Sequence, residues 1–149
     1  MNIPRGRIGI AVVLLLISAA AFAQDDISRH RFCAECGMDR KAYGFSRMLI
    51  VYEDGAEVGA CSLHCAAAAL DKGAGRTVKS ILAADRDRTA LVDAEKATWV
   101  IGGKKRGVMT AVPKWAFAAP EAAEAFVNAH GGKIASWAEA LEAARKEPR

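Results

Sequence analysis

Excess charge, proline and aromatic residues are all scarce in this sequence. Aromatic residues make up 7% of the 149 positions, there are 4 prolines, and the formal net charge is +4. With 52% apolar residues, the composition excludes a collagen-like repeat and a disordered chain. The weak charge gives no support to nucleic-acid binding. The three tryptophans do not alternate with basic residues either, so they read as core side chains.

The only long apolar run lies near the N-terminus, and it is too short to span a membrane comfortably. Arg5 and Arg7 precede this run, which covers residues 8–21, and residues 21–23 read Ala-Phe-Ala. This order is typical of a secretory signal peptide cleaved after Ala23, with an uncleaved anchor as the alternative. No cysteine lies at the cleavage point, so no lipid anchor is expected, and no stable membrane insertion is expected after the signal is cleaved. In a Gram-negative host the mature protein would be periplasmic, where disulfides persist.

The rest of the chain is predicted to repeat one pattern of elements. Residues 48–52 and 57–60 read as strands around a turn, followed by a helix over 63–70 with Ser62 as its N-cap. Strand-forming runs return at 98–101 and at 107–109, where a returning strand is predicted to begin, and residues 115–117 continue the extended stretch. A second helix opens at the proline of residue 120. A Ser-x-x-Glu capping box predicts a last helix over residues 137–145.

We therefore expect an α+β fold of two small, similar strand-turn-strand-helix units packed into one compact body. The predicted divisions are a signal peptide (1–23), a first unit (24–84) and a second unit with Met109 and the C-terminal helices (85–149). Residues 24–32 are expected to be loose, and the charge run at 85–88 to be a solvated loop.

Four cysteines form two close pairs, Cys33-x2-Cys36 and Cys61-x3-Cys65, with 24 residues between the pairs. Two such pairs on either side of a hairpin can converge on one metal ion. The predicted helix N-terminus would also lower the pKa of the Cys61 and Cys65 thiols.

Neighbouring side chains bear on which metal is expected. Met38 follows the first cysteine pair and His64 lies within the second. Thiolate and thioether donors favour Cu(I), whereas zinc accepts cysteine and histidine but has little use for methionine.

Three other interpretations remain open. Four cysteines in an oxidising compartment can form two disulfides, although a bridge from Cys61 to Cys65 within one helical turn is geometrically awkward. A structural zinc knuckle would use the same residues. A thiol–disulfide oxidoreductase is less well supported, because no apolar strand precedes Cys33 and Gly37 disfavours a helix after Cys36.

In these motifs the sequence resembles the nitrous oxide reductase accessory protein family (NosL). The resemblance is carried by residues 33–38 (Cys-Ala-Glu-Cys-Gly-Met) and 61–65 (Cys-Ser-Leu-His-Cys). In the second half it is carried by Trp-Val-Ile-Gly at 99–102, Gly-Val-Met-Thr at 107–110 and Gly-Gly-Lys at 131–133. It extends from about residue 33 to about residue 141.

The resemblance implies a periplasmic metallochaperone, not an enzyme, that binds Cu(I) and delivers it by ligand exchange. The implied client is nitrous oxide reductase, and a membrane metal transporter is another possible partner. Cys36 and Met38 match the family's Cys-Gly-Met motif, and Met109 matches its second-half methionine. The full candidate set for metal is Cys33, Cys36, Met38, Cys61, His64, Cys65 and Met109. Two departures are the missing lipid-accepting cysteine and the additional thiols.

Overall fold

A hairpin of apolar and β-branched residues starts the first sheet. In the computed structural model, which describes residues 25–148, Met48–Tyr52 form β1 and Glu57–Ala60 form β2. Gly55 occupies the turn between them with φ 85°, a conformation that favours glycine. Val78–Ala84 (β3) and Leu91–Asp93 (β4) complete an antiparallel sheet of order β2-β1-β3-β4. The predicted signal peptide lies outside the described residues.

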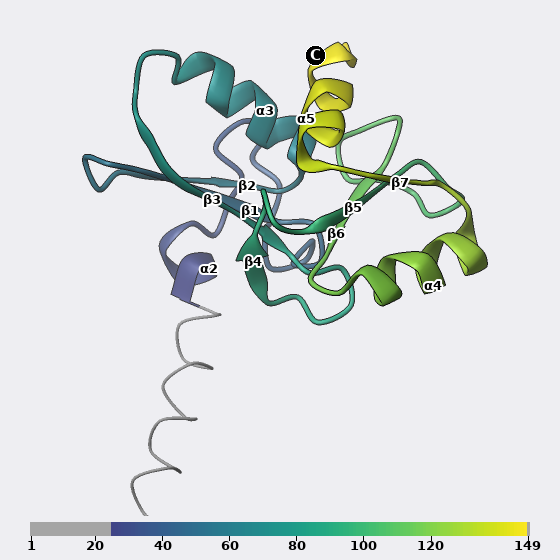
Figure 1. Ribbon diagram of the computed structural model, residues 1–149. Helices are drawn as coiled ribbons and strands as arrows, with labels where there is room; N and C mark the ends of the chain where they lie inside the picture. Colours follow the sequence, from purple (N-terminus) through teal and green to yellow (C-terminus); the bar gives the residue numbers. More distant parts are fainter. Residues whose placement is uncertain (1–24, 149) are drawn as a thin grey trace, which may run out of the picture.

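Helix α3 (Leu63–Lys72) connects β2 to β3 and packs against the hairpin (Figure 1). Residues 66–69 are four consecutive buried alanines. Their small side chains favour a helix and allow its backbone to lie close to the sheet. The packing of α3 against β1 and β2 therefore fixes the position of its first turn beside the hairpin.

The second sheet repeats this path. Thr98–Ile101 (β5), Lys114–Phe117 (β6) and Lys133–Ala135 (β7) pair antiparallel in the order β6-β5-β7, and α4 (Pro120–His130) connects β6 to β7. Both units therefore run strand-strand-helix-strand with the first strand in the middle. The α+β class and the doubled pattern predicted from the sequence are confirmed.

The prediction that the returning strand begins at residues 107–109 is wrong, whereas its continuation over 115–117 lies in β6. Residues 102–113 form a loop between β5 and β6. Gly102, Gly103 and Met109 adopt positive φ angles of 81°, 96° and 51°, which an extended strand does not contain. The returning strand begins only at Lys114.

One main core joins the two units, and helix α5 (Trp137–Lys146) covers part of it. Ser136 and Glu139 form the predicted capping box at the start of α5. The helix packs against both α3 and β5, as Figure 1 shows. Trp99, predicted to be a core residue, is 2% exposed and shares a buried cluster with Ile50 of the first sheet.

The segment 24–32, predicted to be loose, is ordered in part, and the predicted solvated loop at 85–88 is a turn in which Asp87 and Arg88 are exposed but Asp85 is buried. Residues Asp25–Arg29 form the short helix α2, and Asp26 is buried because it pairs with the buried Arg40 and Arg47. Asp85 departs from the prediction because its carboxylate accepts hydrogen bonds from backbone amides, including that of Ala118.

The boundary between the units was predicted after residue 84. β4 follows that residue and pairs with β3, so the first sheet extends to Asp93.

Within residues 25–148, no helix combines the length and the apolar character needed to cross a membrane.

Candidate metal centre

Four thiols from two distant segments converge at the start of α3. The Sγ atoms of Cys33, Cys36, Cys61 and Cys65 all lie within 4.8 Å of one another. Cys36 and Cys61 are 3.5 Å apart at sulfur, and Cys61 and Cys65 are 3.7 Å apart. All four cysteines are free. Donors at 2.3 Å from a tetrahedral ion lie about 3.8 Å from one another, so the thiol spacing fits a single soft metal ion.

A tight turn presents the first pair. The backbone N–H of Gly37 donates to the carbonyl of Cys33, and that of Cys33 donates to the carbonyl of Met38. Gly37 has φ 76°, which a residue with a side chain rarely adopts. The N–H of Ala34 donates to the carbonyl of Gly59 on β2, which fixes the turn beside the second pair. The glycine of the Cys-Gly-Met motif therefore has a geometric role.

The junction of β2 and α3 presents the second pair. Ser62 is the N-cap of α3, as predicted, although its side chain makes no capping hydrogen bond. Cys61 consequently lies just before the helix and Cys65 lies in its first turn. The hydroxyl of Ser46 donates to the carbonyl of Cys61 at 2.7 Å, and Arg40 Nε donates to the carbonyl of Ala60 at 3.1 Å.

The four thiols differ in burial. Cys33, Cys61 and Cys65 are 4%, 0% and 3% exposed, whereas Cys36 is half-buried. Cys36 is thus the thiol through which the centre meets the protein surface.

The thiols also differ in acidity. Hydrogen bonds from the Cys61 and Cys65 thiols stabilise the Cys33 thiolate and lower the pKa of Cys33. The pKa values of Cys61 and Cys65 are raised, because both thiols donate to Cys33 and because both are buried. The prediction that the helix N-terminus lowers the pKa of Cys61 and Cys65 is therefore wrong: burial and competition within the cluster outweigh it.

The other candidate ligands lie at different positions. Met38 is half-buried against the core cluster that contains three of the cysteines. His64 is not part of the close group of ligand atoms, and its Nδ1 lies 3.5 Å from a carboxylate oxygen of Glu147. Met109 lies on the 102–113 loop with 49% of its surface exposed. The structure thus brings the four cysteines together, and the ligand roles of Met38, His64 and Met109 stay predictions.

Glu147 is a residue that the sequence analysis missed. Its carboxylate accepts hydrogen bonds from Lys114 Nζ, the Thr110 hydroxyl and the Val112 N–H, and it contacts His64. It therefore fastens the loop that carries Met109 beside the first turn of α3. Because its hydrogen-bond donors lie 33 to 37 residues away, no local motif could have indicated it.

Comparisons with known proteins give three results. Residues 24–144 match the NosL family. The crystal structure of the copper chaperone NosL from Shewanella denitrificans is similar in fold, with a TM-score of 0.59 and 21% sequence identity, over 72% of this chain and 87% of that chain. No curated protein matches the chain.

Proposed function

The chain belongs to the NosL family, and from this premise we propose that it is a periplasmic chaperone that binds Cu(I) at the four-thiol centre. One observation carries the proposal: four free thiols from two segments lie within 4.8 Å of one another. Soft thiolate donors in this number bind Cu(I) strongly and have little affinity for magnesium or calcium. The solved relative is itself described as a copper chaperone.

Delivery would proceed by ligand exchange rather than by turnover, so the protein is not proposed to be an enzyme. The three buried thiols would shield the cargo, whereas Cys36 and Met38 are half-buried. An incoming donor from a partner can displace Cys36 first and the buried thiols afterwards. Met109 and Val112 are exposed on the loop beside α3 and would contribute to the docking face.

The proposed recipient is nitrous oxide reductase, with a membrane metal transporter as the other possible partner. This step rests on the resemblance of the sequence motifs to the accessory proteins of that enzyme. The proposed compartment rests on the signal-peptide pattern that ends at Ala23.

A second candidate function is a structural zinc centre. The thiol separations of 3.5 and 3.7 Å favour it, because they are close to the edge of a zinc–thiolate tetrahedron, and structural zinc sites are closed in the same way. A thiol–disulfide oxidoreductase is less well supported, since Cys33 is buried and residues 34–38 form a turn rather than a helix.

Competition titrations separate these functions. Reduced protein is titrated with Cu(I) against a Cu(I)-selective colorimetric chelator, and separately with zinc against a zinc chelator. We expect about one Cu(I) per chain, and Cys36→Ser should lower the Cu(I) affinity at least about tenfold. Met38→Leu should weaken Cu(I) and leave zinc unchanged. Met48→Leu, on β1, is the control for loss of a methionine.

The opposite pattern would favour the zinc centre: zinc displaces Cu(I), and Met38→Leu changes neither metal. Activity in an insulin-reduction assay would instead support the oxidoreductase.

In this proposal the redox state of Cys33 and Cys36 would control whether the protein can bind Cu(I). A disulfide between Cys33 and Cys36 removes two thiolates, so oxidised protein should not retain Cu(I). An unchanged Cu(I) affinity after oxidation of this pair would contradict this redox control.

A further inference from the structure

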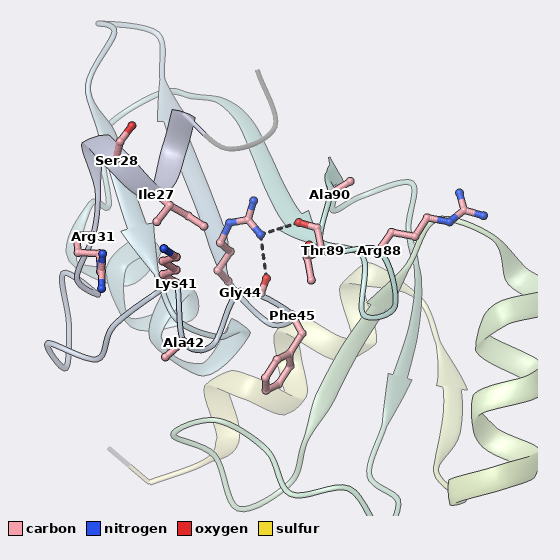
Figure 2. Close-up of a pocket in the computed structure, with 11 residues that line it drawn as sticks. Ile27, Ser28, Arg31, Lys41, Ala42, Gly44, Phe45, Arg88, Thr89 and Ala90 are labelled. Atoms are coloured by element: carbon pink, nitrogen blue, oxygen red, sulfur yellow. Dashed lines mark hydrogen bonds between the residues drawn. The ribbon is translucent and has the colours of Figure 1, made fainter. Parts of the chain in front are cut away.

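A cavity of about 680 Å³ lies between α2, the 41–47 segment and the 88–90 loop, and no cysteine lines it (Figure 2). Its volume is in the range of small-molecule sites. We propose that this cavity binds a small organic anion, in which a carboxylate, sulfonate or phosphate is attached to an apolar body. This inference is independent of the metal centre.

The charge of the lining selects an anion. The lining includes four cations and no acidic residue; the cations are Arg31, Lys41, Arg47 and Arg88. Asp39 pairs with Arg31, and Asp26 pairs with Arg47. Lys41 and Arg88 have no ion-pair partner among the residues that the structure describes. Two positive charges are thus left for a ligand.

The base of the cavity is a buried guanidinium group. Arg47 Nη1 donates to the carbonyl of Gly44 at 2.9 Å and to the carbonyl of Thr89 at 2.6 Å, and Figure 2 shows both bonds. The arginine thereby connects the two sides of the cavity. It also occupies two carbonyl oxygens that would otherwise repel an anion.

Both sides are fixed by aspartate-capped turns. Asp39 Oδ1 accepts from the backbone N–H groups of Lys41 and Ala42, so the turn that carries Lys41 is held in place. On the other side Asp85 Oδ1 accepts from the N–H of Arg88 at 2.8 Å. Thr89 has φ 59°, a strained conformation for a threonine, and strain of this kind is concentrated at functional sites.

The remaining lining explains why the ligand needs an apolar body. Ile27, Ala42, Phe45 and Ala90 contribute hydrocarbon surface, and a bare inorganic anion would leave that surface uncovered. In Figure 2, Arg31 and Lys41 lie on the side of Ile27 and Ser28, and Arg88 extends outward beyond Thr89. Lys41 is therefore expected to contact the anion, and Arg88 to attract it from a distance.

The test uses 1-naphthalenesulfonate as the probe, with naphthalene and inorganic sulfate as its two halves. Binding to the purified protein is followed by amide chemical shifts in NMR. We expect shifts at the backbone amides of 41–45 and 88–90, and tighter binding of the sulfonate than of either half. Lys41→Glu should weaken the sulfonate roughly tenfold or more, and Arg88→Glu should weaken it less.

Lys79→Glu on β3 is the matched control, because Lys79 is exposed, lies outside the lining and undergoes the same charge change. It should leave binding unchanged. Equal weakening by Lys79→Glu would overturn the proposal, since it would indicate attraction to the whole protein. Shifts away from the cavity, or sulfate binding as tightly as the sulfonate, would also overturn it. A thermal unfolding curve for each variant confirms that it is folded.

Discussion

The two strand-strand-helix-strand units share one order of elements, but different kinds of side chain are buried inside them. The first encloses the thiol group and a buried ionic network in which Asp26 pairs with Arg40 and Arg47. The second has its own apolar cluster, formed by Val100, Trp115, Phe117, Ala123 and Phe126. One backbone arrangement therefore supports both a polar, sulfur-rich interior and an aromatic one.

The contrast is sharpest where the second strand of each unit leads into its helix. Two residues separate β2 from α3, and two separate β6 from α4. By this alignment Ala118 occupies the place of Cys61, and Ala122 that of Cys65. The turn before β5, residues 94–97, contains no cysteine, so the cysteine-bearing 33–38 turn has no counterpart before the second unit. The fold thus provides the position, and the first unit alone provides the thiols.

The largest expected effect concerns the ionic network of the first unit. Asp26→Asn leaves two buried guanidinium groups without their counter-charge, and we expect a loss of about 3 kcal/mol or more in the free energy of unfolding. Urea denaturation at pH 7 measures it. Asp87→Asn, at an exposed position, is the control and should change stability by less than about 0.5 kcal/mol. A loss below about 1 kcal/mol for Asp26→Asn would contradict this account.

This effect should depend on pH. Burial raises the pKa of Asp26, but the Arg47 and Arg40 guanidinium groups lower it by more, so it lies below the usual 3.8. A carboxyl with a depressed folded-state pKa stabilises the protein above its unfolded pKa. The advantage over Asp26→Asn should therefore be complete above pH 3.8 and shrink as the pH falls through the folded-state value.

An intermediate effect is expected in the aromatic cluster. Phe126 packs against Trp115 and Phe117 with centroid distances of 6.3 and 5.3 Å. Phe126→Leu should lower the free energy of unfolding by about 1 to 2 kcal/mol and leave metal binding unchanged. Phe32→Leu makes the same change at a residue that is 62% exposed, and should have almost no effect on stability. If both variants lost the same free energy of unfolding, the aromatic cluster would contribute no more to stability than an exposed phenylalanine does.

The smallest effect tests the alignment of the two units. The double variant Ala118→Cys/Ala122→Cys places thiols at the positions that match Cys61 and Cys65. Because the second unit has no counterpart of the 33–38 turn, we expect no additional metal per chain. Metal analysis after gel filtration, with the unmodified protein alongside, measures this. A second equivalent of metal would show that the junction alone suffices.

Much of the fold could be predicted from the sequence because its signals are local. The alanine run of α3, Pro120 at the start of α4 and the Ser136 capping box each act within one or two turns of a helix. The three residues of β4 are too few to show a period, and their pairing with β3 depends on the finished sheet. The start of β6 could not be predicted, because Val108 and Met109 favour a strand whereas the neighbouring glycines favour the loop that residues 102–113 form.

In the candidate site, too, the features that depend on local sequence could be predicted, and those that depend on distant contacts could not. The cysteine pairs could be identified from spacing, and their convergence follows from the intervening hairpin. The buried partners of Asp26 lie 14 and 21 residues away, so composition at 24–32 gave no sign of burial. The acidity of the thiols depends on which sulfurs become neighbours, and the sequence alone does not determine that order.

The separation of the two cysteine pairs along the chain has a consequence for folding. An ion held by Cys36 and Cys61 would close a loop of about 25 residues, much as a disulfide does. In the chain-entropy description such a closure restricts the unfolded ensemble by about 3.5 kcal/mol. The cargo would then serve as a removable cross-link, and the protein would be more easily unfolded after delivery than before it.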